Sequence, residues 1–471
     1  MIESYLACER CGEKFPPFPP RHSCGNCGGL LEYGYAYERL LEEAEFVGTL
    51  SLWRYAKVMP RVEEENIVTL GEGGTPLQHS KRLGPKLGLK NLYFKDETRN
   101  PTNSYRDRCA SLIVSNALEL GYTSLICASN GNMGASLASY ASKAGLNCQI
   151  LVPKKVDEGK LAQMMIHDVI LTEAGEILDE SIERAAKIVE ETGWYQATAE
   201  LNPLTIEALK TIAYEVFEQG INPTWFIVPM GDGGTIHSIW KGFDELKKFR
   251  WTESVPKMIG VQSEACAPIS KAFMAAEESI TPIKNPDTLA LGILVRRPIH
   301  GEKALYCIRN TGGRALTVSD FDILSAQKRI AKLEGLFVEP TSAATVACLE
   351  KLAKGGMIKG GDDVVCLLTS SGLKAPSVLQ TLTKRRKSEG LAMGLSMKNR
   401  ILRIISYKPS YGYEVWKKLG RVITLQAVYQ HLTFLERKGF LSSHKERDKR
   451  FFKITEKGMK ALRAIEELKH L

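Results

Sequence analysis

Four cysteines near the N-terminus have the spacing of metal ligands. Cys8 and Cys11 form one Cys-x-x-Cys pair, and Cys24 and Cys27 form a second pair after a proline-rich loop. Two thiolates on one such turn take two corners of a tetrahedron, so two turns close a structural zinc site with no open position for chemistry. Buried or redox-active cysteines are the alternative, although a redox pair needs only one turn of this kind. We therefore predict a zinc ribbon over residues 1–33, with the other seven cysteines in the core.

A glycine-rich turn is the second candidate for binding chemistry. Gly231, Asp232, Gly233, Gly234 and Thr235 follow the apolar run TWFIVPM and precede a helical segment. Glycines let backbone N–H groups converge, and the N-terminus of a helix adds positive potential, so such a turn is suited to a phosphate. A tight connection without a ligand is the alternative, and the charge of Asp232 opposes a phosphate there.

The middle of the chain alternates apolar runs with amphipathic segments. The runs SLICAS, NCQILVP, TWFIVPM, KMIGVQS and DVVCLLTSSG are separated by helical patterns, which is typical of strands buried on both faces of a parallel sheet. In such sheets ligands bind at the carboxyl ends of the strands. The sequence therefore predicts an α/β fold with its binding residues on the turns that follow the strands.

Six phrases in a fixed order point to a family. KDETRNPTNSYRDR, ASNGNMGAS, VPMGDGGTIHSIWKGF, GVQSEACAPI, EPTSAA and LLTSSGLKAP occur along the chain in this order. Together they resemble the threonine synthase branch of the pyridoxal-phosphate enzymes with the tryptophan synthase β-subunit fold, called fold type II. The resemblance implies parallel sheets in two subdomains, here over residues 34–380, and some members carry a similar zinc ribbon.

The same resemblance implies roles for individual residues. Asn132 would face the phenolic oxygen of the cofactor, Gly231 to Thr235 would hold its phosphate, and Thr369 would meet its pyridine nitrogen. Ser104 and Asn130 complete the pocket that we predict.

Arg106 departs from the family pattern. In the family the segment reads PTGSFKDR, and its lysine forms the Schiff base with the cofactor, whereas PTNSYRDR places Arg106 there. A guanidinium stays charged and cannot attack an aldehyde as a free amine does. In AELNPLTIEALK, moreover, Ala199, Glu200 and Thr205 replace an amide, a hydroxyl and an arginine of the family's substrate region. We therefore expect a pseudoenzyme without threonine synthase turnover, and we read Lys95 as an ordinary motif position that does not replace the lost lysine.

The altered pocket is still expected to bind a small ligand. Arg106 offers a bidentate fork for a carboxylate or a phosphate. The candidates are pyridoxal phosphate held noncovalently, its adduct with an amino acid, an amino acid such as threonine, or a phosphorylated precursor. A relic scaffold that binds nothing is the alternative.

The charge of the chain is uneven. From Thr383 onward there are 22 Lys and Arg against eight Asp and Glu, a net charge of +14, whereas the preceding residues carry −5. A basic tail on an acidic body is typical of a protein that binds a polyanion at one end. A solvated, lysine-rich helical surface is the alternative.

The basic tail has the pattern of a winged helix. After a linker at 381–396, Thr424 is a candidate N-cap for a helix whose stripe of Leu425, Val428, Leu432 and Leu435 faces a core. YGYEV, LERKGFL and FFKITEKG are similar to phrases of PadR-like or MarR-like domains, so we assign residues 397–471 to DNA binding. The predicted DNA contacts are Gln426, Tyr429, Gln430 and Thr433 on the recognition helix, and Lys445, Arg447, Lys449 and Arg450 on the wing. A winged helix used only for protein contacts is the alternative.

These features predict a cytoplasmic transcription regulator. The chain opens without a signal segment and has no apolar stretch of about 18 residues, so we expect neither export nor a membrane span. We expect a homodimer on a palindromic operator, with an amino-acid-related ligand as the signal. Two alternatives remain: an active pyridoxal-phosphate enzyme whose tail regulates its own gene, and a tail that serves dimerisation without DNA.

Overall fold

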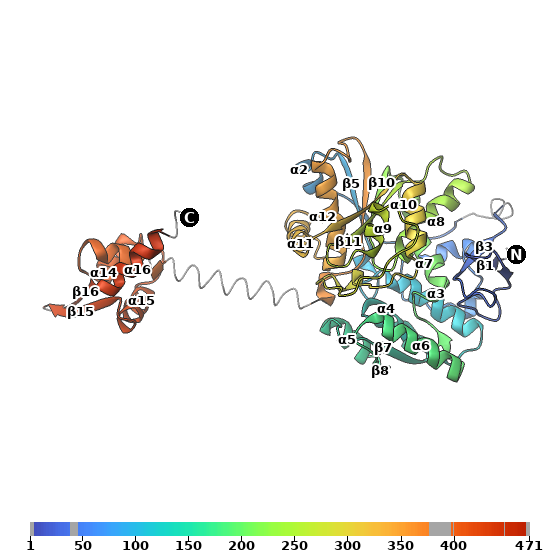
Figure 1. Ribbon diagram of the computed structural model, residues 1–471, viewed down its shortest axis with the longest axis horizontal. Coiled ribbons are helices and arrows are strands. Elements are labelled where there is room, and N and C mark those ends of the chain that lie inside the picture. The colour runs from blue at the N-terminus through green and yellow to red at the C-terminus, as the bar shows by residue number, and fades with distance from the viewer. Residues whose placement is uncertain (1–3, 38–45, 376–396, 399, 447, 468–471) are drawn as a thin grey trace. The chain divides into compact units, whose positions relative to one another are not determined.

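The computed structural model describes residues 4–37, 46–375, 397–398, 400–446 and 448–467. The chain divides into two compact units, Met1–Pro376 and Ser377–Leu471 (Figure 1), and each unit has its own hydrophobic core. The predicted boundaries at 33, 380 and 396 stay predictions, and the predicted linker at 381–396 lies outside the described residues.

The first unit opens with a small antiparallel sheet of order β2-β1-β3. Its strands are β1 (Ser4–Cys8), β2 (Lys14–Phe15) and β3 (Leu31–Tyr35). Tyr35 at the end of β3 is buried and donates a hydrogen bond to the Glu207 carboxylate. This sheet, which carries the four spaced cysteines on its turns, therefore packs on the α/β body.

The larger sheet of the body has the order β12-β11-β10-β13-β5-β4. All neighbours pair in parallel except β4 and β5, which are antiparallel. The strands are β4 (Leu77–His79), β5 (Asn91–Asp96), β10 (Trp225–Pro229), β11 (Lys257–Ser263), β12 (Arg314–Val318) and β13 (Asp363–Leu368). The apolar runs predicted as buried strands form β10, β11 and β13, because helices cover both faces of a parallel sheet.

A smaller sheet of order β8-β7-β6-β9 is parallel throughout. Its strands are β6 (Ser124–Ala128), β7 (Asn147–Val152), β8 (Ile170–Glu173) and β9 (Tyr195–Gln196). It lies with α4 (Asn132–Ala144), α5 (Glu158–Met165) and α6 (Leu178–Thr192) at one side of the first unit (Figure 1). The fold class predicted from the sequence, parallel sheets in two subdomains, is confirmed.

Helices connect and cover the strands of both sheets. Helices α7 and α8 pack against each other, as do α11 and α12. The helices of this unit are α2 (Leu83–Lys86), α3 (Arg106–Glu119), α4 (Asn132–Ala144), α5 (Glu158–Met165), α6 (Leu178–Thr192), α7 (Leu204–Glu218), α8 (Gly234–Lys248), α9 (Pro268–Met274), α10 (Gly301–Asn310), α11 (Asp320–Glu334) and α12 (Pro340–Lys354). Short 3-10 turns occur at Leu52–Val58, Glu64–Asn66, Glu97–Arg99, Leu291–Ile293 and Gly372–Lys374.

A group of paired charges is buried inside this unit. Arg108 pairs with Glu97 at 2.8 Å and with Glu215 at 2.5 Å, and Lys95 pairs with Glu215 at 2.6 Å. All four side chains are inaccessible to solvent, and such charges are tolerated only when they are paired. Lys95 is therefore a structural residue, as its reading as an ordinary motif position requires.

The second unit is a small helical domain with an antiparallel sheet. Residues 400–407 are helical. The elements that follow are β14 (Ser410–Tyr411), α14 (Gly412–Lys418), α15 (Leu425–Arg437), β15 (Leu441–Glu446), β16 (Lys449–Ile454) and α16 (Glu456–Glu467), with the sheet order β14-β16-β15. The Thr424 side chain accepts a hydrogen bond from the backbone N–H of Ala427 at 3.2 Å, so the predicted N-cap is formed. Val428, Leu432 and Leu435 are buried in the core of this unit.

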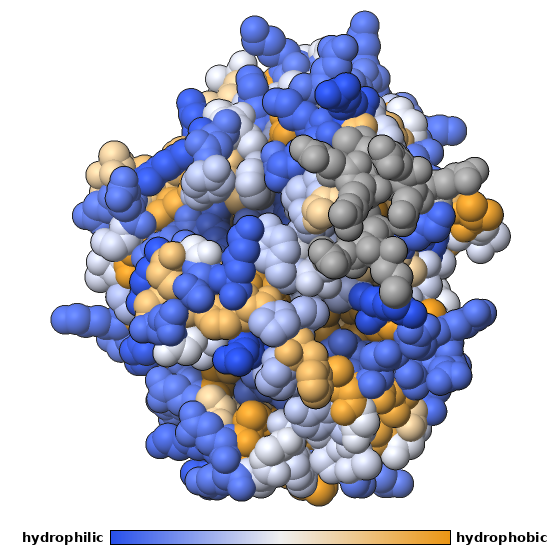
Figure 2. Space-filling model, turned by 90° about the vertical axis from the view of Figure 1, so that its right-hand side faces the viewer, coloured by the Kyte–Doolittle hydropathy of each residue, from blue (hydrophilic) through white to orange (hydrophobic). Residues whose placement is uncertain are grey.

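The molecular surface is mainly polar on the face shown in Figure 2, where apolar side chains form separate smaller areas. None of the helices within the described ranges is both long enough and apolar enough to span a bilayer. The seven cysteines outside the N-terminal set are all buried, as predicted.

Candidate functional site

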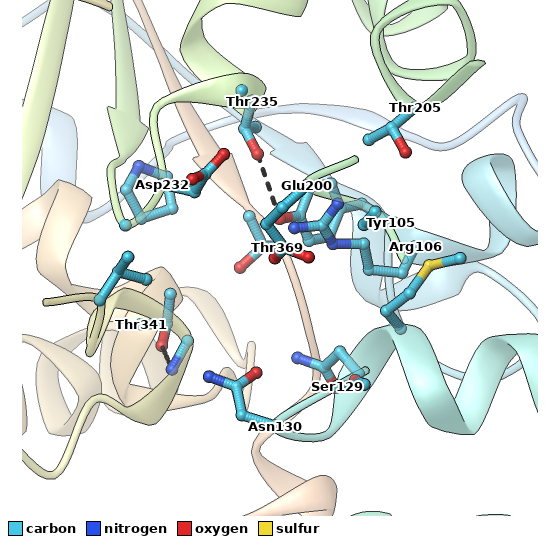
Figure 3. Close-up of a pocket in the computed structure, with 18 of the residues that line it drawn as sticks. Tyr105, Arg106, Ser129, Asn130, Glu200, Thr205, Asp232, Thr235, Thr341 and Thr369 are labelled. Carbon is cyan, nitrogen blue, oxygen red and sulfur yellow. Dashed lines mark hydrogen bonds between the residues drawn. The ribbon is translucent and has the colours of Figure 1, made fainter. Parts of the chain in front are cut away.

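A cavity lies where the carboxyl ends of strands from both sheets meet. It is lined by the turn after β6, the glycine turn after β10, Thr369 after β13 and Arg106 at the start of α3 (Figure 3). Polar side chains from several elements point into it. This is the position at which open parallel sheets bind ligands, because the strand-to-helix turns converge there.

Nine of the ten predicted pocket residues line this cavity. They are Arg106, Asn130, Asn132, Gly231, Asp232, Gly233, Gly234, Thr235 and Thr369. Ser104 is not among the lining residues: it is fully buried, and its hydroxyl accepts a hydrogen bond from the backbone N–H of Arg106 at 3.3 Å. Its place is therefore behind Arg106.

The glycine turn brings the N-terminus of α8 to the cavity. Gly233 has a φ of +102°, and a Cβ atom there would lie 2.5 Å from the His300 carbonyl oxygen. Only glycine fits such an approach without strain. The Thr235 hydroxyl lies 3.2 Å from the Tyr105 hydroxyl (Figure 3).

Asp232 is held in this turn by backbone donors. Its carboxylate accepts a hydrogen bond from the Ile299 N–H at 2.7 Å. Burial raises its pKa to about 6, although the backbone hydrogen bond from Ile299 and the charge of Arg106 oppose that rise. A carboxylate thus stands beside the N-terminus of α8, as the sequence indicated.

Arg106 supplies the cavity with a cation. Its guanidinium carbon lies 4.9 Å from the centre of the Tyr105 ring. Burial alone would lower its pKa, but Tyr105, Cys109 and Glu200 outweigh burial and raise the pKa above its ordinary value, so the side chain stays charged. No carboxylate of the described residues forms an ion pair with it, and although its side chain hydrogen-bonds with Cys109, its other donors are available to a ligand.

Glu200 lies close enough to Arg106 for their charges to interact (Figure 3). Burial is the main cause that raises the pKa of Glu200 to about 7; the charge of Arg106 opposes the rise, and Asp232 and Asp179 add to it. The carboxyl group is therefore about half ionised near neutral pH. Glu200 was noted in the sequence as a replacement, but it was not among the predicted pocket residues.

Two buried polar atoms on lining residues have no partner. The Thr205 hydroxyl and Nδ1 of His300 make no hydrogen bond, although these residues are only 3% and 7% exposed. His300 Nε2 lies 3.1 Å from the Glu200 carbonyl oxygen. Because burial lowers the pKa of His300 to about 3, the ring is neutral, and donation from Nε2 leaves Nδ1 as an acceptor. Buried atoms of this kind normally have partners.

Lys160 is the one lysine among the described residues that line the cavity. Its ammonium pairs with Asp157 at 2.9 Å and with Glu339 at 3.3 Å. The Asn132 amide donates to the same Glu339 carboxylate at 3.2 Å. Lys160 and Glu339 were not predicted, and the phrase EPTSAA, which contains Glu339, was the one available signal.

The cavity residues fit pyridoxal phosphate in part. The glycine turn at the start of α8 would hold the phosphate, and the buried Thr369 hydroxyl, which lies 2.9 Å from the Ser342 hydroxyl, would meet the ring nitrogen. Arg106, Glu200 and Thr205 are lining residues that depart from the family pattern, and the Asp232 carboxylate lies beside the proposed phosphate site. When bound, the cofactor would supply an electron sink, and the glycine turn and Thr369 would hold and orient it.

The four N-terminal cysteines come together as a cluster. Their sulfur atoms all lie within 4.8 Å of one another, and the closest contacts are 3.4 Å between Cys8 and Cys27 and 3.6 Å between Cys11 and Cys24. A tetrahedral zinc site with Zn–S bonds of about 2.3 Å has sulfur separations of about 3.8 Å. The cluster therefore fits a structural metal ion.

The second unit exposes most of the predicted DNA contacts. Gln426, Tyr429 and Gln430 are exposed on α15, and Thr433 is half-buried. Lys445 and Lys449 are exposed on the wing, whereas Arg447 lies outside the described residues. The ladder of β15 and β16 extends to the pair Glu446 and Lys449, so the wing is a tight hairpin.

Arg450 differs from the other wing residues. Its guanidinium pairs with Glu436 of α15 at 2.7 Å and donates to Ser443 at 2.9 Å. A cation neutralised in this way is a weaker phosphate contact than a free lysine. Arg450 joins the wing to the recognition helix.

Two family models match the chain. Residues 68–370 match the pyridoxal-phosphate dependent enzyme family, and residues 401–464 match the transcriptional regulator PadR-like family. These ranges coincide with the α/β body and with the winged helix.

Three similar curated proteins are all named threonine synthase. A threonine synthase of Methanocaldococcus jannaschii is 40% identical over 78% of this chain and 92% of the relative. One of Methanosarcina acetivorans is 40% identical over 80% and 93% of the two chains. A threonine synthase of Mycobacterium leprae is 35% identical over 68% and 88%.

Solved structures agree on the fold. Maize serine racemase matches with a TM-score of 0.56 and 19% identity over 67% of this chain and 93% of its own. A processed threonine deaminase isoform from Solanum lycopersicum matches with a TM-score of 0.56 and 20% identity over 69% and 88%.

These relatives correct one prediction. The expectation of a pseudoenzyme, drawn from Arg106, is wrong as it was stated, because the relatives at 35–40% identity are enzymes and nothing in the structure shows that the domain is inactive. One substituted side chain is weaker evidence about activity than sequence similarity to enzymes over the whole α/β domain. The chain belongs to the pyridoxal-phosphate dependent enzyme family, as a threonine synthase-like domain joined to a PadR-like regulator domain.

Proposed function

We propose that this protein is a DNA-binding transcription regulator whose threonine synthase-like domain binds an amino-acid-related small ligand. The observation that carries the proposal is the presence, in one chain, of a polar ligand cavity and a winged helix with Tyr429 and Gln430 exposed on its recognition helix. The cavity would bind the ligand, and the winged helix would bind the DNA whose transcription the ligand controls.

The winged helix would read DNA with α15 and hold it with the wing. Exposed amide and hydroxyl groups on a recognition helix reach base edges in the major groove, and exposed lysines contact the phosphates. A homodimer on a palindrome, as symmetry favours, would place two α15 helices about one or two helical turns apart. The match to the PadR-like family supports this assignment.

DNA binding is tested by fluorescence anisotropy. Full-length protein is titrated with the DNA upstream of its own gene and with a shuffled duplex of the same length. We expect tighter binding to the upstream DNA, weaker binding by Lys445→Ala, and unchanged binding by Lys143→Ala, which removes an exposed lysine of the other unit. Equal affinity for both duplexes would refute DNA regulation and favour a tail used for protein contacts.

Ligand control is tested in the same assay. L-Threonine, L-homoserine, O-phospho-L-homoserine and pyridoxal phosphate are added separately to the complex. A ligand changes the DNA affinity only as far as it binds the DNA-bound and the free protein differently. If no compound that binds the protein shifts the DNA affinity, the sensing role is refuted.

The second candidate function is threonine synthase activity with a tail that regulates the gene. The name shared by the relatives at 35–40% identity favours it. Release of phosphate from O-phospho-L-homoserine in the presence of pyridoxal phosphate measures it directly. Borohydride treatment followed by peptide mapping would show whether Lys160 becomes linked to the cofactor. Turnover that depends on Lys160 would establish an enzyme.

A further inference from the structure

We propose that the cavity selects an unphosphorylated, zwitterionic α-amino acid, whose carboxylate binds Arg106 and whose ammonium binds Glu200. This inference rests on the proposed function and names the ligand class of the same cavity. It narrows the earlier candidates, which included a phosphorylated precursor and the cofactor itself.

The first step concerns the carboxylate. Arg106 lies at the start of α3 and lines the cavity, and its guanidinium stays protonated. It has no ion-pair partner among the described residues. A guanidinium presents parallel N–H donors that match a carboxylate in a bidentate arrangement. Its stacking on the Tyr105 ring, at 4.9 Å, orients that fork.

The second step concerns the ammonium. Glu200 and Asp232 lie close enough to each other and to Arg106 for all three charges to interact. The Asp232 carboxylate already accepts the Ile299 N–H, whereas the Glu200 carboxylate has no side-chain donor among the described residues. An ammonium beside Glu200 would relieve the repulsion between the two acids and supply the missing donor.

The third step concerns the unpaired atoms. The Thr205 hydroxyl and Nδ1 of His300 are buried without partners on two lining residues. A polar group deprived of water costs free energy until it is hydrogen-bonded. A small ligand that brings a donor and an acceptor, such as the hydroxyl of a hydroxyamino acid, satisfies both kinds of atom.

The charges that line the cavity oppose a phosphorylated ligand. The carboxylates of Glu200, Asp232 and Glu339 face two cations, Arg106 and Lys160. Lys160 is already paired with Glu339 at 3.3 Å. A ligand with a phosphate and a carboxylate would bring two anionic groups to a site where one cation is available, so repulsion by Glu200 and Asp232 disfavours it.

Calorimetric titration of the full chain with matched ligands tests this selectivity. L-Homoserine is compared with O-phospho-L-homoserine, and L-threonine with O-phospho-L-threonine, in the absence of added pyridoxal phosphate. We expect the unphosphorylated member of at least one pair to bind about tenfold or more tightly than its phosphorylated partner. Equal or tighter binding of both phosphorylated ligands, binding that requires added pyridoxal phosphate, or no binding overturns the proposal.

Variants and one analogue test the assigned contacts. Glu200→Gln and Arg106→Gln should each weaken amino acid binding about tenfold or more, because each removes one charged partner. Glu190→Gln, an exposed glutamate on α6, is the matched control and should bind as the wild type does. 3-Hydroxybutyrate, which lacks the amine, should bind about tenfold or more weakly than threonine to the wild type. Unchanged binding by Glu200→Gln, or of the analogue, refutes the ammonium contact even if Arg106→Gln fails to fold.

A double variant tests specificity in the opposite direction. Glu200→Ser with Thr205→Arg restores the hydroxyl and the arginine of the family pattern, while Ala199 stays unchanged, and should raise the affinity for O-phospho-L-homoserine relative to homoserine. An unchanged ratio overturns the assignment of these two positions. Failure of the upstream DNA to bind would refute the regulator while leaving the selectivity intact, so the two proposals fail separately.

Discussion

Amino acid binding is expected to tighten as the pH rises from 5 to 8. Glu200 must be ionised to accept the ligand's ammonium, and its pKa in the free protein is raised by burial and by its acidic neighbours. A bound ammonium favours the ionised form and lowers that pKa. The free protein therefore carries a proton that the complex releases, and the affinity follows the ionised fraction of Glu200.

The magnitude follows from a pKa of about 7 for Glu200. The ionised fraction is about 1% at pH 5, about 50% at pH 7 and about 90% at pH 8, so the affinity rises about 50-fold and then about twofold more. Asp232 titrates near 6 and acts in the same direction. Arg106, which also faces Glu200, stays charged over this range, and His300 stays neutral, whereas burial raises the pKa of the nearby Asp179.

The assay is calorimetric titration at several pH values in two buffers with different ionisation enthalpies. The difference in measured heat gives the number of protons released, which should be about one at pH 5 and about half at pH 7. Glu200→Gln should lose most of the pH dependence and retain the smaller contribution of Asp232. Proton uptake, or an affinity that falls as the pH rises, would refute the reasoning.

The other predictions concern metal, stability and DNA. Cys11→Ser should lower the zinc content measured by mass spectrometry and the melting temperature, because it opens the four-sulfur cluster. Glu215→Gln should lower the free energy of unfolding in urea by about 3–5 kcal/mol, since two buried cations lose a partner. Because the pKa of Glu200 is raised in the folded state, the folded chain binds more protons than the unfolded chain between about pH 4.5 and 7. The free energy of unfolding therefore falls as the pH rises through this range. Glu200→Gln should therefore raise the melting temperature at pH 8 and leave it unchanged at pH 4. Lys445→Ala should reduce the slope of log affinity against log salt by about one per chain.

The sequence predicts elements whose signals are local. The stripe of Val428, Leu432 and Leu435 lies within one helix, and the cap at Thr424 adjoins it, so both could be identified without knowledge of the fold. The strand-to-helix turns around the cavity were found for the same reason. The two-residue strand β14 was not predicted, because so short a segment gains its geometry from pairing with β16 and not from its own pattern.

Other features depend on contacts that are distant along the chain. Lys160 reaches the cavity through its pairing with Glu339, which is 179 positions later in the sequence. His300 enters it from the segment that packs over the glycine turn. Arg450 looked like a free wing cation until the pair with Glu436 placed it against α15. The periodicity of a sequence cannot predict such pairs, since they form only when separate elements pack together.

The joint role of Arg106 and Glu200 can be recognised only in the folded chain, where both line the same cavity. Read alone, the arginine indicated a lost reaction, and the glutamate indicated a weakened substrate contact. In the cavity the two side chains bring one positive and one negative charge within interaction distance of each other, which gives the site two opposite poles. A site with two opposite poles is complementary to a zwitterion. Because Glu200 and Asp232 together place two carboxyl groups beside one cation, a ligand that brings an ammonium to Glu200 and a carboxylate to Arg106 explains both substitutions better than two independent losses do.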